Sequence, residues 1–496
     1  MSDTTMVAME SMDPQTGSML TQIPLEILVR ITRSISTKDL GNVRLSCKAL
    51  EQGLFHFFSH EFFRKKQFMA TTDSLQALVD ISKHPTLSPF LKHVIISADR
   101  PAVVTQWGPQ IDQKARDRLE VAIADHMHLM ATGGLRDMLV EAFAHLANLE
   151  TVDIRNFNSP SRNREGLGTQ WRSYGAIALE ASTSSTVEAR THSDQDQYTA
   201  QLFCAVTTAL AVAEARPKSI EVLLRTQRGR FAVDLGDTAF YIPPRMEPSM
   251  SSMLANLKTL HLTLGFLRWK TARPFILGKF LSLATGLTWL RLNFGVPASA
   301  MLNVEEVFSL LAPKDFQNAN ALPATHPINL PHLERLDLGD AETEAAALLR
   351  LVAKFAPTLT SLYLRRVCIV DPENHNRTTK INPWERYLSA MCRLPGLNLR
   401  VLDFSSITTA SNGWRGPVSF KVGERADATP RYSPNWKCST SFVTFDKVIG
   451  QAIAAMHVDW PQPLDPNGSD DESSGEEEEY VEEEDDEEED DGEGEE

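Results

Sequence analysis

A six-residue pattern, L-x-x-L-x-L or a close relative, recurs eight times along this chain of 496 residues and limits the folds open to it. The copies begin at Leu91, Leu149, Ile220 (the weakest match), Leu257, Leu287, Leu333, Leu359 and Leu399. Apolar residues at the fourth and sixth positions alternate as in a strand with one buried face. Segments between the copies, such as residues 268–285, 301–312 and 342–355, have the spacing of amphipathic helices. The sequence therefore predicts an α/β fold in which strands and helices alternate.

One strand and one helix per unit resembles a leucine-rich repeat. The eight starts lie 58, 71, 37, 30, 46, 26 and 40 residues apart, whereas leucine-rich repeats run about 20 to 29 residues. The resemblance therefore implies an irregular leucine-rich-repeat-like solenoid over roughly residues 85–410, with inserted segments between its units. A non-solenoid α/β domain with a parallel sheet would show the same alternation and is the alternative.

Residues 22–50 predict two short amphipathic helices. Pro24 suits the first position of a helix, and Ser36 with Asp39 forms a capping-box pattern that begins a second one. The residues predicted to share an apolar face are Ile23, Ile27, Leu28 and Ile31 in the first helix and Leu40, Val43, Cys47 and Leu50 in the second. So small a unit cannot bury both faces by itself, and we expect a partner to cover them.

This stretch resembles an F-box, the segment that binds the Skp-family adaptor of cullin-RING ubiquitin ligases and opens with L-P-x-E-I-L. The matching residues are Pro24, Glu26, Ile27, Leu28, Asp39, Leu40, Arg44, Cys47 and Lys48. Ile23 and Leu50 stand where leucine and tryptophan are usual. The resemblance covers about a tenth of the chain, and the aromatic stretch that follows is similar to filamentous-fungal members. It implies adaptor binding by Ile23, Pro24, Ile27, Leu28, Ile31, Leu40, Val43, Cys47 and Leu50. An ordinary helical hairpin packed on its own protein is the alternative.

The resemblances and composition together predict a domain order. We expect a disordered segment at residues 1–18, the F-box at 19–66, a leucine-rich-repeat-like substrate-binding domain at 67–460 with a mobile insertion near 158–198, and a disordered acidic tail at 461–496. The helical spacing of Phe55, Phe58, Phe62 and Phe63 predicts a hydrophobic joint between the first two folded parts. Residues 313–331 and 408–436 predict loops, and residues 439–460 predict a final strand or cap and a helix.

The negative charge of the chain is concentrated at its C-terminal end. The formal net charge is −16, yet residues 469–496 hold 20 of the 65 acidic residues and no Lys or Arg, so the remainder carries +4. A segment that repels itself and has almost no apolar surface cannot fold alone. The tail is either a site for basic proteins or a solvating segment with no dedicated partner.

The sequence gives no sign of catalysis. It has no P-loop, G-x-S-x-G, H-E-x-x-H or paired C-x-x-C motif, and its five cysteines are scattered. His126 and His128 fall on different faces of a helix predicted over residues 114–130. Residues 64–66 are the main basic run, and no apolar segment is long enough for a bilayer. We therefore expect a non-enzymatic cytoplasmic or nuclear protein with no cofactor, no metal, no membrane and no direct nucleic-acid binding.

Residues that alternate with the buried leucines of a repeat line one open face of its sheet. In the clearest strands these residues are His261, Trp289, Arg291, Arg335, Asp337, Tyr363, Arg365 and Asp403. Trp, Tyr and Arg are the types most enriched in binding hot spots. We therefore expect Trp289, Arg291, Tyr363 and Arg365 to bind a protein substrate.

The F-box resemblance and this open face imply the substrate-recognition subunit of an SCF-type cullin-RING E3 ubiquitin ligase. Such a subunit does no chemistry itself. It binds the Skp-family adaptor, and through it a cullin, and accelerates ubiquitin transfer by holding an as yet unknown protein substrate nearby. The alternative is a non-ligase interaction scaffold or an acidic-tailed chromatin-associated binding protein.

Overall fold

The computed structural model describes residues 19–101, 112–159, 165, 169–185, 187–188, 195–225, 235–265, 275–295, 301–313, 328–371, 382–411, 414–422, 431–439 and 444–460. Those from Met19 to Asp459 belong to one compact unit. The segments at 1–18 and 461–496, for which the sequence predicts disorder, lie outside the described residues.

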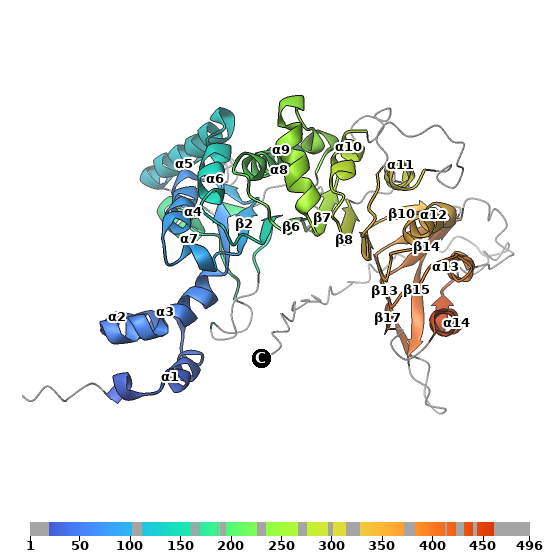
Figure 1. Ribbon diagram of the computed structural model, residues 1–496, viewed down its shortest axis with the longest axis horizontal. Coiled ribbons are helices and arrows are strands. Elements are labelled where there is room, and N and C mark those ends of the chain that lie inside the picture. Colours follow the sequence, from blue (N-terminus) through green and yellow to red (C-terminus); the bar gives the residue numbers. More distant parts are fainter. Residues whose placement is uncertain are drawn as a thin grey trace, which may run out of the picture. The chain divides into compact units, whose positions relative to one another are not determined.

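Helices occur throughout the described part of the chain (Figure 1). The α-helices are α1 (Leu25–Thr32), α2 (Thr37–Ser46), α3 (Lys48–Phe63), α4 (Thr72–Lys83), α5 (Gln113–Thr132), α6 (Gly134–Phe143), α7 (Ala176–Thr183), α8 (Gln195–Val212), α9 (Glu247–Asn256), α10 (Phe275–Leu283), α11 (Met301–Leu311), α12 (Ala345–Phe355), α13 (Pro383–Met391) and α14 (Phe445–Ala455). Short 3-10 helices are η1 (Met19–Gln22), η2 (Ser88–Phe90), η4 (Asp237–Phe240) and η5 (Pro244–Met246).

The main sheet has ten strands, and each lies beside the next main strand of the chain. In order they are β1 (Lys65–Met69), β2 (His93–Ser97), β4 (Thr151–Arg155), β6 (Ser219–Leu223), β7 (Thr259–Leu264), β8 (Trp289–Phe294), β9 (Arg335–Gly339), β11 (Ser361–Arg365), β13 (Val401–Ser405) and β17 (Asn435–Ser439). All pairs are parallel except β13 with β17. The predicted mixed α/β fold with alternating strands and helices is confirmed.

The remaining strands form two smaller sheets. The first contains β10 (Glu342–Glu344), β12 (Cys368–Val370), β14 (Thr408–Ser411), β15 (Trp414–Val422) and β16 (Arg431–Ser433), with β18 (Met456–Val458) paired to β15. The second is the pair β3 (Arg100–Pro101) and β5 (Val187–Glu188). The prediction of loops over residues 408–436 was therefore wrong. Pro and Gly disfavour regular structure locally, but here they did not prevent antiparallel strand pairing.

All eight leucine-patterned segments form strands of the main sheet. The residues in one shared row of the register are Val94, Val152, Ile220, Leu260, Leu290, Leu336, Leu362 and Leu402, and all are buried. Ile220 occupies the fourth position of its copy, so that copy begins at Pro217 and not at Ile220. No leucine pattern predicts β1, whose sequence is K-K-Q-F-M.

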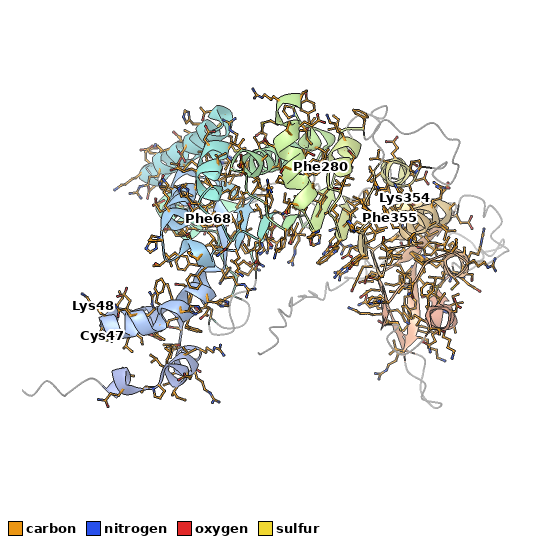
Figure 2. The ribbon with its side chains drawn as sticks, viewed as in Figure 1. Cys47, Lys48, Phe68, Phe280, Lys354 and Phe355 are labelled. Atoms are coloured by element: carbon orange, nitrogen blue, oxygen red, sulfur yellow. The ribbon has the colours of Figure 1, made fainter. Side chains whose placement is uncertain are left out.

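The core lies between this sheet and a row of neighbouring helices (Figure 1). Helices α4, α6, α8, α10, α12 and α13 each bury apolar residues, and the leucines of the main strands are buried as well. The rings of Phe203, Phe240 and Phe280 meet with centroids 5.4 to 5.8 Å apart and join α8, η4 and α10. Figure 2 labels Phe280. Aromatic clusters of this kind contribute more than their buried area alone.

A repeated turn follows three consecutive main strands. Asp340, Arg366 and Ser406 each come directly after β9, β11 and β13 and have φ of 55°, 50° and 50°. The Asp340 amide donates to the Arg365 carbonyl, and the Arg366 amide donates to the Ser405 carbonyl. Left-handed backbone is costly for these residue types, so this ladder between turns holds it in place. The turn directs the chain into β10, β12 and β14.

The predicted insertion near 158–198 is partly regular. Its described residues contain α7, with Ala176 and Thr183 buried, and the start of α8. The amide of Tyr174 donates to the carbonyl of Gln67 in β1 at 2.8 Å. The insertion therefore adds to the edge of the main sheet, although the sequence there has little apolar periodicity.

Candidate partner-binding surfaces

The N-terminal helices have a small core of their own. Four buried leucines, Leu28, Leu40, Leu50 and Leu54, contact one another across α1, α2 and α3. Partly buried residues around them are Ile23, Val29, Ile35, Val43, Phe57, Phe58 and Phe62. Three helices meeting around four leucines is a minimal hydrophobic core, so each of these side chains contributes a large share of its stability.

The start of α2 is as predicted, but its end is not. The Ser36 side chain accepts from the Asp39 amide at 3.1 Å and caps the helix. Cys47 is extended, with φ of −159°, and separates α2 from α3 (Figure 2 labels Cys47 and Lys48). The prediction that Leu40 and Leu50 share one helix face was wrong. They lie in two different helices, because α2 ends before Cys47 and α3 folds back on α2.

Exposed apolar side chains are concentrated on this helical unit. Of the fourteen large apolar residues exposed in the described part of the chain, the five that lie here are Leu20, Leu25, Ile27, Ile31 and Leu45. Ile27 is 49% exposed, Ile31 is 44% exposed and Leu45 is 85% exposed. Ile27 and Ile31 are four residues apart and so lie on one side of α1. We call these five residues the outer apolar set.

The sequence-predicted adaptor-binding residues divide into two groups. Leu28, Leu40 and Leu50 are buried in the helical core, and Ile23 and Val43 are partly buried against it. Those exposed are Pro24, Ile27, Ile31 and Cys47. The buried leucines can act on a partner only by holding the helices, whereas the exposed residues can touch one. Leu25 and Leu45 were missed, because only the fold of the unit shows which apolar residues the core leaves outside.

The aromatic residues of α3 connect the helical unit to the sheet domain. The rings of Phe55 and Phe90, the latter in η2, pack edge to face with centroids 6.4 Å apart. The Lys66 ammonium of β1 lies 5.2 Å from the Phe63 ring. The Arg44 guanidinium covers the Phe58 ring at 3.4 Å. The contacts of Phe55 and Phe63 fit the predicted hydrophobic joint, whereas Phe58 and Phe62 pack against the core of the helical unit itself.

The face of the main sheet opposite the helices is covered at one end and accessible further along. In β2 and β4, most residues that point to this face are buried, including Asp153 and Arg155. Arg155 donates to Asp153, and Gln67 donates to Ser173 from the segment after β4 at 2.9 Å. In β8, β11 and β13, buried and half-buried residues alternate strictly. The accessible part therefore begins near β8.

Arg335 is the centre of this accessible part. Its guanidinium carbon lies 3.8 Å from the centroid of the Trp289 ring and 4.0 Å from that of the Tyr363 ring. It also donates to both carboxylate oxygens of Asp337 at 2.8 and 2.9 Å. Two rings and a bidentate carboxylate fix the orientation of the guanidinium. The sequence placed Arg335 on this face but not among the binding residues, because its stacking depends on the cross-strand register.

Arg291 and Arg365 extend the cluster across the same face. Burial lowers the pKa of Arg291, the nearby Asp337 raises it, and Arg365 and Arg335 lower it further. The Arg291 Nε lies 3.5 Å from Oδ1 of Asn293, whose side chain occupies the space over Gly339. A Cβ at position 339 would collide with that amide. Trp289, Arg291, Arg335, Tyr363 and Arg365 are called the arginine surface below.

His261 lies beneath one side of the arginine surface. Its ring meets that of Trp289 edge to face with centroids 4.4 Å apart, and it is only 4% exposed. Neither of its ring nitrogens has a hydrogen-bond partner among the described residues. Burial, followed by the charges of Arg291 and Arg335, lowers the pKa of His261 to about 3. The imidazole is therefore neutral at physiological pH.

Possible metal ligands and membrane-spanning helices can be examined in the described residues. Within them, His, Cys, Asp and Glu side chains do not gather in threes as a metal site would need. Their helices are also too short or too polar to cross a bilayer. His126, one of the two paired histidines of the sequence, is buried with Nδ1 2.8 Å from the Ala70 carbonyl, whereas His128 is exposed.

Comparisons with known proteins find similarity to solved structures but no matching sequence. No protein-family model matches the chain, and no curated protein sequence matches it. The chain is similar to the crystal structure of the leucine-rich repeat-containing protein LegL7 from Legionella pneumophila, with 12% sequence identity and a TM-score of 0.22. That similarity covers 70% of this chain and 91% of the other.

Proposed function

We propose that this protein is the substrate-recognition subunit of an SCF-type cullin-RING E3 ubiquitin ligase. Residues 19–66 would be its F-box and would bind the Skp-family adaptor. The strand and helix units that follow would form an irregular leucine-rich-repeat-like solenoid that binds a protein substrate. The protein contributes proximity between the substrate and the charged conjugating enzyme and no bond-making of its own.

The proposal rests on one observation: the apolar residues of the helical unit fall into a buried core and an exposed set. The leucines of the F-box-like stretch form a core, and the outer apolar set remains exposed and supplies five of the fourteen large apolar residues exposed in the described part of the chain. Exposed apolar residues this dense are typical of a surface that another protein covers. Their burial against an adaptor would provide most of the binding free energy, because about 25 cal/mol is gained for each Å² removed from water.

Affinity purification from cells tests the proposal. The intact chain should recover both a Skp-family adaptor and a cullin. The double variant Ile27→Asp, Ile31→Asp should lose both, since each carboxylate would be desolvated without a partner. A matched control, Val121→Asp with Met127→Asp, changes two exposed apolar residues of α5 and should retain both proteins.

Three results of this purification would contradict the proposal. Recovery of neither protein by the intact chain would favour an adaptor-independent scaffold or chromatin-associated binding protein. Recovery of the adaptor without a cullin would favour a scaffold that uses the adaptor alone. Undiminished recovery by Ile27→Asp, Ile31→Asp would remove the outer apolar set from the binding site.

A further inference from the structure

The arginine surface has an excess of positive charge. Strands β8, β9 and β11 together carry three arginines, Arg291, Arg335 and Arg365, and one acidic residue, Asp337, which gives a net charge of +2. On the neighbouring strands the charges offset each other, because Asp403 of β13 lies 3.3 Å from Lys437 of β17. The middle of the accessible face therefore differs in charge from its end.

The positive groups of this surface are close enough to affect one another. Burial lowers the pKa of Arg291, and the charges of Arg365 and Arg335 lower it further against the opposing effect of Asp337 and Glu221. Guanidinium groups stay protonated at such sites. Placing them close together and partly out of water therefore costs free energy through mutual repulsion and lost hydration. An anionic partner would relieve both costs, and it would meet an Arg335 already held between two rings. Preorganisation of this kind reduces the entropy lost on binding.

The spacing of the arginines favours an extended chain over a single compact anion. They occupy three strands and three different rows of the same face. Neighbouring strands are about 4.8 Å apart and alternate residues of a strand about 6.8 Å apart, so the arginine Cα atoms lie roughly 8 to 14 Å from one another. Alternate side chains of an extended peptide have comparable separations. A lone phosphate would reach one or two of these groups.

We propose that the arginine surface binds an extended, carboxylate-rich segment of the protein substrate. The proposal rests on the substrate-receptor role given above and adds the chemical class of what is recognised. Arg335, Arg291 and Arg365, in that order along the rows, pair with carboxylates on alternate residues of the segment. The rings of Trp289 and Tyr363 support Arg335 and contact the apolar parts of the bound chain.

A fluorescent twelve-residue peptide of alternating Glu and Thr is the probe for this proposal. Its anisotropy is measured with the full chain, and a Gln and Thr peptide is the neutral control. The Glu peptide should bind at least about tenfold more tightly, since contacts between charged groups are the stronger class of hydrogen bond. Its binding should weaken as salt is raised. A full-length chain with Asn and Gln replacing the acidic residues of 469–496 is measured alongside, so that its own carboxylates do not compete.

Variants locate the site of binding. Arg365→Gln should weaken the Glu peptide by about tenfold, and adding Arg335→Gln should weaken it further. A matched charge change on the helices, Arg116→Gln with Arg136→Gln, should leave binding unchanged. Because Arg335→Gln removes the partner of buried Asp337, the thermal midpoint is recorded for each variant, and Arg365→Gln alone decides the result where folding is affected.

Several outcomes would overturn the proposal. They are equal binding of the Glu and Gln peptides, equal loss in the helix control, and tighter binding of a peptide whose only acidic group is one phosphoserine. If any of these occurs while the adaptor and cullin are still recovered, the class of recognised segment is wrong and the receptor role stands. If the intact chain does not recover the adaptor, the proposed receptor role itself is wrong.

Discussion

The outer apolar set of the N-terminal helices and the arginine surface of the sheet are both accessible. They differ in the residues that form them and in the buried residues beneath them. The first consists of aliphatic side chains over a core of four leucines. The second consists of arginines and rings on strands whose alternate residues are fully buried. An aliphatic surface gains free energy from burial and depends little on salt, whereas a charged one depends strongly on it. We therefore expect the two surfaces to recognise their proposed partners by physically different means.

The largest effect is expected from Leu40→Asp. Leu40 is fully buried in the small helical core, and an unpaired carboxylate there should cost about 3 to 5 kcal/mol, more than so small a unit can lose. Hydrogen exchange should show loss of protection over residues 25–63. The main sheet should stay protected, because its core is separate. Unchanged protection over residues 25–63 would mean that the helical unit does not depend on this core.

A smaller effect should separate the two faces of the sheet. Leu362→Ala should lower the free energy of unfolding by about 2 to 5 kcal/mol, because it leaves a cavity beneath the helices. Tyr363→Ala, one residue along β11, should cost no more than about 1.5 kcal/mol, because its ring is half-buried on the accessible face. Denaturant unfolding measures both. Equal losses would show that the Tyr363 ring belongs to the core and not to a binding surface.

A further effect concerns His261 and pH. Its folded pKa of about 3 lies below the ordinary value of 6.5, so the unfolded chain binds the extra proton between these values. This contribution to stability is therefore complete above about pH 6.5 and is lost as pH falls toward 3. His261→Gln should flatten the loss of stability between pH 6.5 and 4.5. Part of the slope should remain, because burial also lowers the pKa of His93 and His126. An identical slope in the variant would contradict a buried, neutral His261.

The strands of the sheet could be predicted because leucine spacing reports burial directly. The register of the Ile220 copy was displaced by three residues, because Pro217 stands where the pattern expects a leucine. Strand β1 has no leucine, and β15 to β17 lie in a segment rich in Pro, Gly and Asn. Pairing with an existing sheet edge formed these strands, and local sequence does not encode that pairing.

Less of the two surfaces could be predicted. Alternation along β8 and β11 was enough to place Trp289 and Tyr363 on the accessible face. The position of Arg335 between them depends on the register of three strands joined by long connections. The outer apolar set likewise depends on how α3 folds back after the break at Cys47. Both are tertiary features that a helical or strand period cannot show.

Direct titration of the purified chain with a purified Skp-family adaptor tests the central claim. We predict a one-to-one complex whose affinity falls by at least about a hundredfold in Ile27→Asp, Ile31→Asp, depends little on salt, and is unchanged in Arg365→Gln. No complex with the intact chain, or equal affinity for the intact chain and the apolar variant, would contradict the account.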